Sequence, residues 1–192
     1  MVSINTLKSH CLQTVYFPAA DHTGENIAHG LRESLSNWGL KEEDQTCITT
    51  DNGSNVVKAV ELNHWTRLQC FGHRLHLAID NALKEKTMKD RINRATGLYR
   101  KTRHLVPSWQ DIEVLESINN ALCPLQEFTD ALSGEAYVSV SYLKTVLHLL
   151  KTSTLAAKDE DTALTKEIKS LVLGYMENKY SDPATQELLD IT

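Results

Sequence analysis

Apolar and polar positions follow two different periods along this chain. Up to about residue 83, short runs rich in strand-forming residues at 9–17, 45–50 and 67–71 predict three strands. Between and after them, apolar residues recur every three or four positions, which predicts helices. Strands separated by helices pair in parallel through right-handed crossovers. This part of the chain is therefore predicted to be α/β, in the order β-α-β-α-β-α.

Local signals mark the ends of the first two helices. Thr23 is a good N-cap, with Asn26 three residues later, and Gly39 is expected to end the helix that follows. A second, short helix is predicted over 54–62. The helix after the third strand carries its apolar residues at Leu75, Ile79, Ala82 and Leu83.

From residue 84 onward the pattern is helical only, so we predict two domains, 1–83 and 84–192. Pro124 is expected to kink or split the long helix that carries the main apolar stripe of the second domain. Core packing is the simplest interpretation of that stripe, and a partner-binding groove is the alternative. The stripe consists of Trp109, Ile112, Leu115, Ile118, Leu122, Leu125, Phe128 and Leu132, and the last helix is marked by Leu164, Ile168, Leu171 and Tyr175.

The composition is that of a folded globular protein of 192 residues with a net charge of −5. No apolar run is long enough to span a bilayer, which excludes a membrane partner. Residues 1–18 show no signal-peptide pattern, so an intracellular location is expected. The cysteines lie in apolar contexts and are predicted to be reduced and buried; they are Cys11, Cys47, Cys70 and Cys123.

The charge is distributed unevenly. The segment from Lys84 to Arg103 contains eight Lys or Arg and two acids, a local charge of +6, which leaves the rest near −11. This indicates one phosphate-facing element on an acidic body; a solvated helix face or a nuclear-import patch are the alternatives. No aromatic residues alternate with these charges to stack single-stranded bases. The candidate DNA-binding residues are Lys84, Lys86, Lys89, Arg91, Arg94, Arg100, Lys101 and Arg103.

The second predicted strand runs into Asp51 and a turn with Gly53. A carboxylate fixed at a strand end can hold a divalent metal beside a phosphodiester. Alternatively, Asp51 and Ser54 cap the following helix, since Asp, Asn and Gly are common in strand-to-helix turns. Because Mg²⁺ needs more than one carboxylate, Asp51 taken alone favours the capping role.

The third predicted strand runs into Cys70 and a helix that carries His73 and His76. Zinc is bound by Cys and His, but it requires four ligands or three plus water. His64 is the nearest further donor. The pattern therefore favours a structural motif, in which Cys70 is a buried thiol and His73 hydrogen-bonds the backbone near the helix start, over a zinc site.

Three pieces of the sequence together resemble the hAT-superfamily transposases, and more closely the zinc finger BED domain-containing proteins derived from them. Their order and spacing match the family, and the resemblance extends over nearly the whole chain. The pieces are His22-Thr23-Gly24-Glu25-Asn26-Ile27, Thr50-Asp51-Asn52-Gly53-Ser54-Asn55 with Val57-Lys58-Ala59-Val60, and Cys70-Phe71-Gly72-His73-Arg74-Leu75-His76-Leu77.

The resemblance implies a partial RNase H-like mixed sheet with flanking helices over 1–83, followed by an all-helical, insertion-type segment over 84–192. The family's catalytic centre is two Asp and one Glu that hold divalent metal, and Asp51 falls at the second Asp. Asp21 and Asp44 lie outside the motif of the first Asp, and no Glu motif occurs before Thr192.

The resemblance also implies parts that are not found here, namely the BED zinc finger, the dimerisation segment and further helices before Trp109. The chain is therefore expected to be an interior fragment of a domesticated, catalytically inactive transposase-like protein with a nuclear DNA-binding or transcription-regulatory role. Asp51 would be a vestigial catalytic residue, and Mg²⁺ would belong only to an intact parent. The alternatives are a fragment of a Mg²⁺-dependent transposase and a helical protein-interaction module. Homo-oligomerisation is a further expectation, and no small-molecule substrate is evident.

Overall fold

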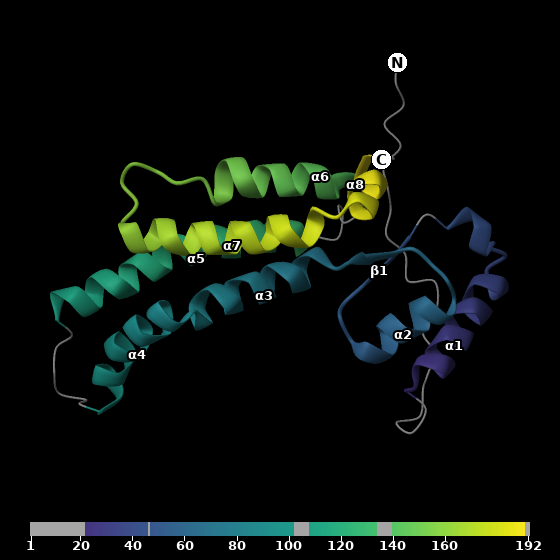
Figure 1. Ribbon diagram of the computed structural model, residues 1–192, viewed down its shortest axis with the longest axis horizontal. Helices are drawn as coiled ribbons and strands as arrows, with labels where there is room; N and C mark the ends of the chain where they lie inside the picture. The colour runs from purple at the N-terminus through teal and green to yellow at the C-terminus, as the bar shows by residue number, and fades with distance from the viewer. Residues whose placement is uncertain (1–21, 46, 102–107, 134–139, 191–192) are drawn as a thin grey trace, which may run out of the picture. The chain divides into compact units, whose positions relative to one another are not determined.

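The computed structural model describes residues 22–45, 47–101, 108–133 and 140–190, and the chain divides into two compact units, Met1–His73 and Arg74–Thr192 (Figure 1). Several predictions concern positions outside the described residues. These are the strand at 9–17, Cys11, Asp21, Arg103 and the junction at Pro107.

The first unit is built on two helices and a small parallel sheet. The strands pair in parallel with Ile48 opposite Arg67 and Thr50 opposite Gln69. The elements are α1 (Gly24–Asn37), the 3-10 turn η2 (Glu42–Asp44), β1 (Ile48–Thr50), α2 (Ser54–Leu62) and β2 (Arg67–Gln69).

Local chemistry fixes both ends of α1. The Thr23 hydroxyl accepts a hydrogen bond from the backbone N–H of Asn26, which confirms the predicted N-cap. At the other end Gly39 adopts a φ of +66°, and the N–H of Leu40 returns to the carbonyl of Leu35 at 2.9 Å. This left-handed turn is the standard use of glycine after a helix, so Gly39 ends α1 as predicted.

Helices α1 and α2 pack through small residues. Ala28 and Ala59 are buried, and the amide of the buried Asn63 donates to the carbonyl of Ala28 at 3.1 Å. About one turn nearer the N-terminus of each helix, Lys58 forms an ion pair with Glu25. The predicted helix over 54–62 is confirmed residue for residue.

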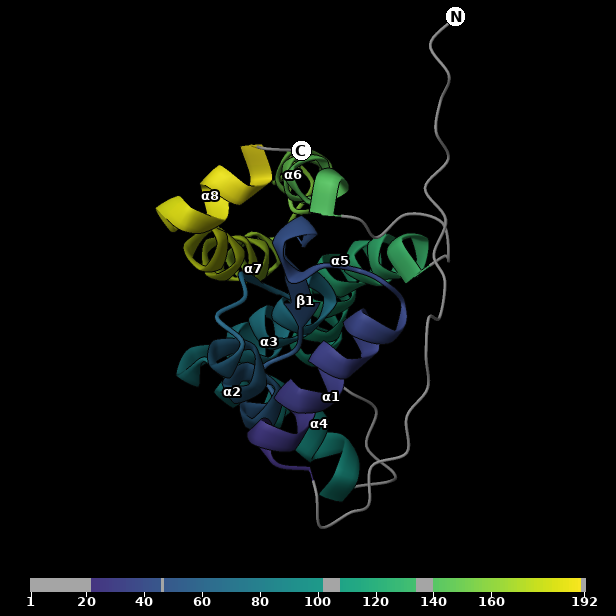
Figure 2. The same ribbon diagram turned by 90° about the vertical axis from the view of Figure 1, so that its right-hand side faces the viewer.

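The second unit is entirely helical in its described part. Helices α5 and α7 lie side by side, and α8 lies beside α6 (Figures 1 and 2). Leu125, Leu150 and Ile168 are fully buried at the centre of this unit. The elements are α3 (Phe71–Lys84), which begins in the first unit, α4 (Lys86–Lys101), α5 (Trp109–Ser133), α6 (Val140–Leu149), the π-helical turn η3 (Leu150–Thr154), α7 (Ala163–Tyr180) and α8 (Pro183–Asp190).

The predicted α/β fold with a partial RNase H-like mixed sheet is wrong for this structure. Helix accounts for 77% of it, and the described residues contain a single two-stranded parallel sheet. Both strands are cut to three residues, because the turn at Asp51 follows Thr50 directly and Phe71 already begins α3. Such short strands cannot provide the broad sheet face on which an α/β domain is built.

The long stripe of α5 also differs from prediction. The helix is not split at Pro124 but runs unbroken from Trp109 to Ser133. Proline removes one backbone donor and frees the carbonyl four residues earlier, and that residue, Asn120, is exposed to water that can bond it. Trp109 is 86% exposed, so it is not a core residue.

Two buried polar contacts hold the start of α7. The Thr165 hydroxyl donates to the carbonyl of Ser117 on α5 at 3.0 Å. The ammonium of Lys169 lies 2.7 Å from Asp161 and also donates to the carbonyl of Ala156, and both members of this ion pair are buried. The loop before α7 is thereby tied to the helix it precedes.

Candidate functional site

Asp51 lies at the turn between β1 and α2, and its carboxylate is exposed but engaged. Its Oδ1 accepts a hydrogen bond from the backbone N–H of Gly53 at 2.9 Å. Such a side-chain-to-backbone bond two residues ahead is an Asx turn, the local conformation that leads a strand into a helix. The structure therefore gives Asp51 a local, turn-forming role. The predicted capping by Asp51 and Ser54 is wrong in detail, because the N-cap of α2 is Gly53, Ser54 is the first residue of the helix, and no side chain caps it.

Arg67 on β2 holds the same turn from the neighbouring strand. Its Nε donates to the Thr50 hydroxyl at 2.7 Å, and its Nη2 donates to the Asn52 side chain at 2.9 Å and to the carbonyl of Asp51. The guanidinium thus ties the turn to β2 through the backbone of Asp51 and the side chains of Thr50 and Asn52. Nothing in the sequence motif pointed to Arg67.

Two-metal chemistry requires several oxygen ligands around one point. Among the described residues, no group of three or more His, Cys, Asp or Glu side chains is arranged to hold a metal ion. Asp44 lies in η2, away from the Asp51 turn in sequence, and Asp21 lies outside the described residues. The vestigial catalytic role of Asp51 remains a prediction from the resemblance alone.

Replacing Asp51 by alanine is expected to lower the free energy of unfolding by about 1 kcal/mol, because the N–H of Gly53 loses its acceptor. Asp51→Asn keeps an acceptor oxygen and should lose less. Urea denaturation followed by circular dichroism measures both variants. A Mg²⁺-dependent DNA cleavage activity that disappears in Asp51→Ala would overturn the structural assignment.

The Cys70 turn joins β2 to α3. The N–H of Cys70 donates to the carbonyl of Thr50 at 2.8 Å and so extends the strand ladder by one bond. Cys70 and His73 are half-buried, whereas His76 is exposed. His64 lies in the loop before β2 with a φ of +56°.

Cys70 and His73 thus lie at the junction between β2 and α3. The hydrogen bond from Cys70 to Thr50 is donated by its backbone N–H and does not involve its thiol. Of the other cysteines, Cys47 is half-buried, and burial raises the pKa of its thiol. Cys123 is exposed on α5, so the prediction that it is buried is wrong.

The basic segment forms the end of α3 and the whole of α4. Two of its described cations form ion pairs within this unit: Lys84 pairs with Asp80 at 2.7 Å, and Arg91 lies 3.7 Å from Glu167 on α7. The hydrogen bond from Lys84 lowers the pKa of Asp80. Lys86, Lys89 and Arg94 are exposed, Arg100 and Lys101 lie in the last turn of α4, and Arg103 is outside the described residues.

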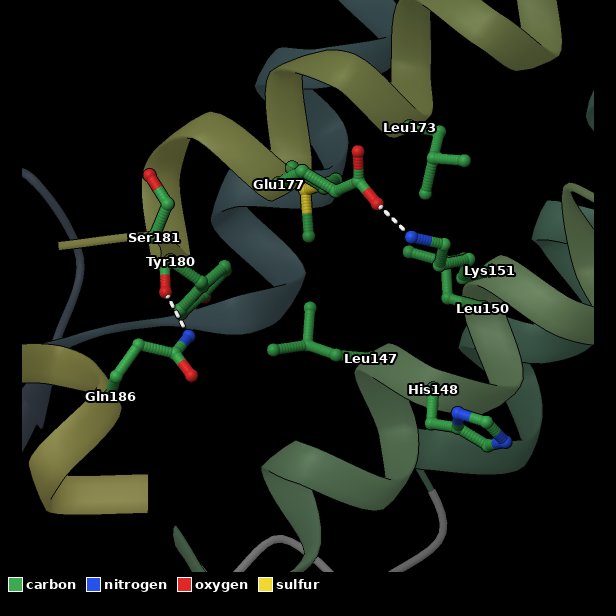
Figure 3. A pocket seen from close by; sticks show the side chains of 10 residues that line it. Leu147, His148, Leu150, Lys151, Leu173, Glu177, Tyr180, Ser181 and Gln186 are labelled. Atoms are coloured by element: carbon green, nitrogen blue, oxygen red, sulfur yellow. Dashed lines mark hydrogen bonds and ion pairs between the residues drawn. The ribbon is translucent and has the colours of Figure 1, made fainter. Parts of the chain in front are cut away.

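A pocket of about 330 Å³ in the second unit was not predicted from the sequence (Figure 3). Its wall is formed by Leu147 and Leu150 on one side and by Leu173 and Met176 of α7 on the other. Leu147 and Leu150 lie three residues apart, as do Leu173 and Met176, so each pair falls on one face of its helix. The mutual placement of the two faces, which creates the pocket, has no local sequence signal.

Comparison of the chain with models of known protein families, with curated proteins and with solved structures finds no match. The resemblance to the hAT transposases therefore rests on the motifs alone. None of the described helices combines the length and the apolar character needed to cross a membrane, as the sequence predicted.

Proposed function

We propose that this chain is a catalytically inactive DNA-binding protein that contacts duplex phosphates through the exposed cations of α4. The motif resemblance, which implies a nuclear DNA-binding or transcription-regulatory role, supports the same class of function. The observation that carries the proposal is the exposed basic face of α4, formed by Lys86, Lys89 and Arg94.

The register of α4 separates a core face from a charged face. Met88 and Ala95 are seven residues apart, and both are buried. At 100° per residue, Lys86, Lys89 and Arg94 fall within the opposite arc of the helix. Cations on one face can contact successive phosphates without unfolding the helix.

The cations on this face of α4 are available to bind a partner, because few acidic side chains lie close to them. Within the described part of the chain, no acidic side chain lies within ion-pair distance of Lys86 or Lys89. Arg94 donates its Nε to the backbone carbonyl of Asp90, which leaves the rest of its guanidinium exposed. Asp90 is the acid on this face, and its charge opposes an approaching phosphate.

The test measures binding of a random-sequence 20-base-pair duplex by fluorescence anisotropy across a range of salt concentrations. The affinity should fall steeply with salt. Neutralising Lys86, Lys89 and Arg94 with glutamine should reduce the slope of log K against log salt by about 0.9 for each phosphate that no longer pairs with a cation. Asp90→Asn should raise the affinity, because it removes the opposing charge.

The matched control is Lys166→Gln, which removes one exposed lysine from α7 and should leave the salt slope unchanged, unlike Lys89→Gln. Equal effects of the two single variants would indicate non-specific attraction to any surface lysine. Binding that does not depend on salt, or no binding at low salt, would contradict the proposal.

A helical protein-interaction module is the second candidate, favoured by the 86% exposure of Trp109 at the start of α5. Tryptophan is enriched among residues that dominate protein interfaces. On this view a second copy of the chain covers Trp109. Salt-insensitive dimerisation in sedimentation velocity, abolished in Trp109→Ala, would favour this candidate over DNA binding.

A further inference from the structure

The pocket between α6–η3 and α7, here called the α6–α7 pocket, has an apolar interior with a polar rim. Leu147, Leu150 and Leu173 lie around it in Figure 3, and Met176 also lines it. Its volume of about 330 Å³ lies at the lower end of the range for small-molecule sites, which is about 300 to 1,000 Å³. The pocket therefore suits a small ligand with an apolar body.

Polar contacts lie on opposite sides of Leu147 at the rim of the pocket. On one side the Lys151 ammonium lies 2.7 Å from the Glu177 carboxylate, and on the other the Gln186 side chain donates to the carbonyl of Tyr180 (Figure 3). The first contact bridges η3 and α7 across the pocket, and the second joins α8 to the end of α7. The polar groups therefore lie at the rim, on either side of the apolar lining residues.

The wall that carries Lys151 is a π-helical turn. The N–H of Leu155 bonds the carbonyl of Leu150 at 2.8 Å, a spacing of five residues, and the Thr152 hydroxyl donates to the carbonyl of His148. Short π-helical turns inside helices occur frequently at functional sites, because they re-aim side chains at some cost in stability. Here the π turn contains the cation on the pocket rim.

The rim presents two nitrogen donors from one helical turn, Lys151 and His148, and one carboxylate, Glu177. The side chains of Lys151 and Glu177 are 59% and 51% exposed. So exposed an ion pair contributes little to stability, and water can solvate Glu177 if Lys151 takes another partner. A ligand carboxylate would gain both donors, whereas a ligand ammonium would gain Glu177 alone.

We propose that the α6–α7 pocket binds a small anionic amphiphile. Its unbranched apolar tail lies between the half-buried Leu147 and Leu173, and its carboxylate replaces Glu177 as the partner of Lys151, with His148 as a second donor. The site uses none of the α4 cations and is independent of the proposed DNA binding.

The test titrates the full chain with octanoate, octylamine and octan-1-ol, three probes with the same tail, by isothermal calorimetry and two-dimensional amide NMR. Octanoate should bind at one saturable site, about tenfold more tightly than the other two. Lys151→Gln should weaken octanoate about tenfold and leave octan-1-ol unchanged. Lys166→Gln, an exposed lysine outside the pocket, should change nothing.

Leu173→Phe, which adds volume inside the pocket, should weaken all three probes, and a thermal melt shows whether this variant is folded. If it is not, the exposed Lys151 substitution still decides the result. Equal or tighter binding of octylamine, an unchanged octanoate affinity in Lys151→Gln, or no binding at millimolar octanoate would each overturn the proposal.

Discussion

Replacing Lys169 by alanine is expected to lower the free energy of unfolding by about 3 to 5 kcal/mol. The Lys169 and Asp161 side chains are 3% and 8% exposed, and their charged groups lie 2.7 Å apart. Removing the lysine leaves the Asp161 carboxylate bonded to the backbone N–H of Lys158 but without its charged partner, and it frees the carbonyl of Ala156 as well. Urea denaturation followed by helical circular dichroism measures the loss.

Two comparisons isolate the ion pair. Lys166→Ala removes an exposed lysine from the same helix and should cost less than about 0.5 kcal/mol. The double variant Lys169→Met with Asp161→Leu removes both charges and should recover much of the stability, because paired apolar side chains avoid the desolvation cost. A Lys169→Ala variant as stable as Lys166→Ala would refute the assignment.

The same pair predicts how stability depends on pH. The hydrogen bond from Lys169 holds the pKa of Asp161 below its ordinary value in the folded state. A depressed folded pKa contributes stability above the unfolded pKa, about 3.9, and this contribution is lost as pH falls through the folded value. The stability gap between the natural chain and Lys169→Ala should therefore be full near pH 6 and should narrow below about pH 4.

Features with local signals were predictable from the sequence. The Thr23 cap, the Gly39 stop and the helix over 54–62 each depend on residues within a few positions of one another, and all three are confirmed. The strands were predicted where they occur, at 45–50 and 67–71, but each is shorter than its run. A strand's length depends on what it pairs with, so local pattern fixes its presence better than its extent.

Features that depend on distant partners were not predictable. Ser117 and Thr165 are polar and yet buried, because both hydroxyls find partners across two helices. The Thr165 hydroxyl donates to the backbone carbonyl of Ser117, and the Ser117 hydroxyl lies 2.8 Å from that of Thr162. At the candidate site, the motif predicted that Asp51 lies at the end of a strand. The hydrogen bond from Arg67 to Thr50 beside it could not be predicted in this way, because it depends on the register of the two strands. The sequence-level error of a broad α/β sheet has the same origin, since a run of strand-forming residues does not reveal how many strands will pair.

The register of α7 provides the second large prediction. From the sequence, the last helix is marked by apolar residues at helical spacing, namely Leu164, Ile168, Leu171 and Tyr175. In the structure the buried stripe shifts to Leu164, Ile168, Val172, Met176 and Tyr180, and Leu171 is 37% exposed. Both stripes are apolar at helical spacing, so packing against α5 decides between them.

Ile168→Ala is therefore expected to lower the free energy of unfolding by about 3 to 4 kcal/mol, whereas Leu171→Ala should lower it by less than about 1 kcal/mol. Ile168 is fully buried, so truncating it loses both transfer energy and the packing of the cavity walls. The two variants share a helix, a unit and nearly the same change in volume. Similar losses for both, measured by the same urea denaturation, would mean that α7 packs in the register the sequence predicted.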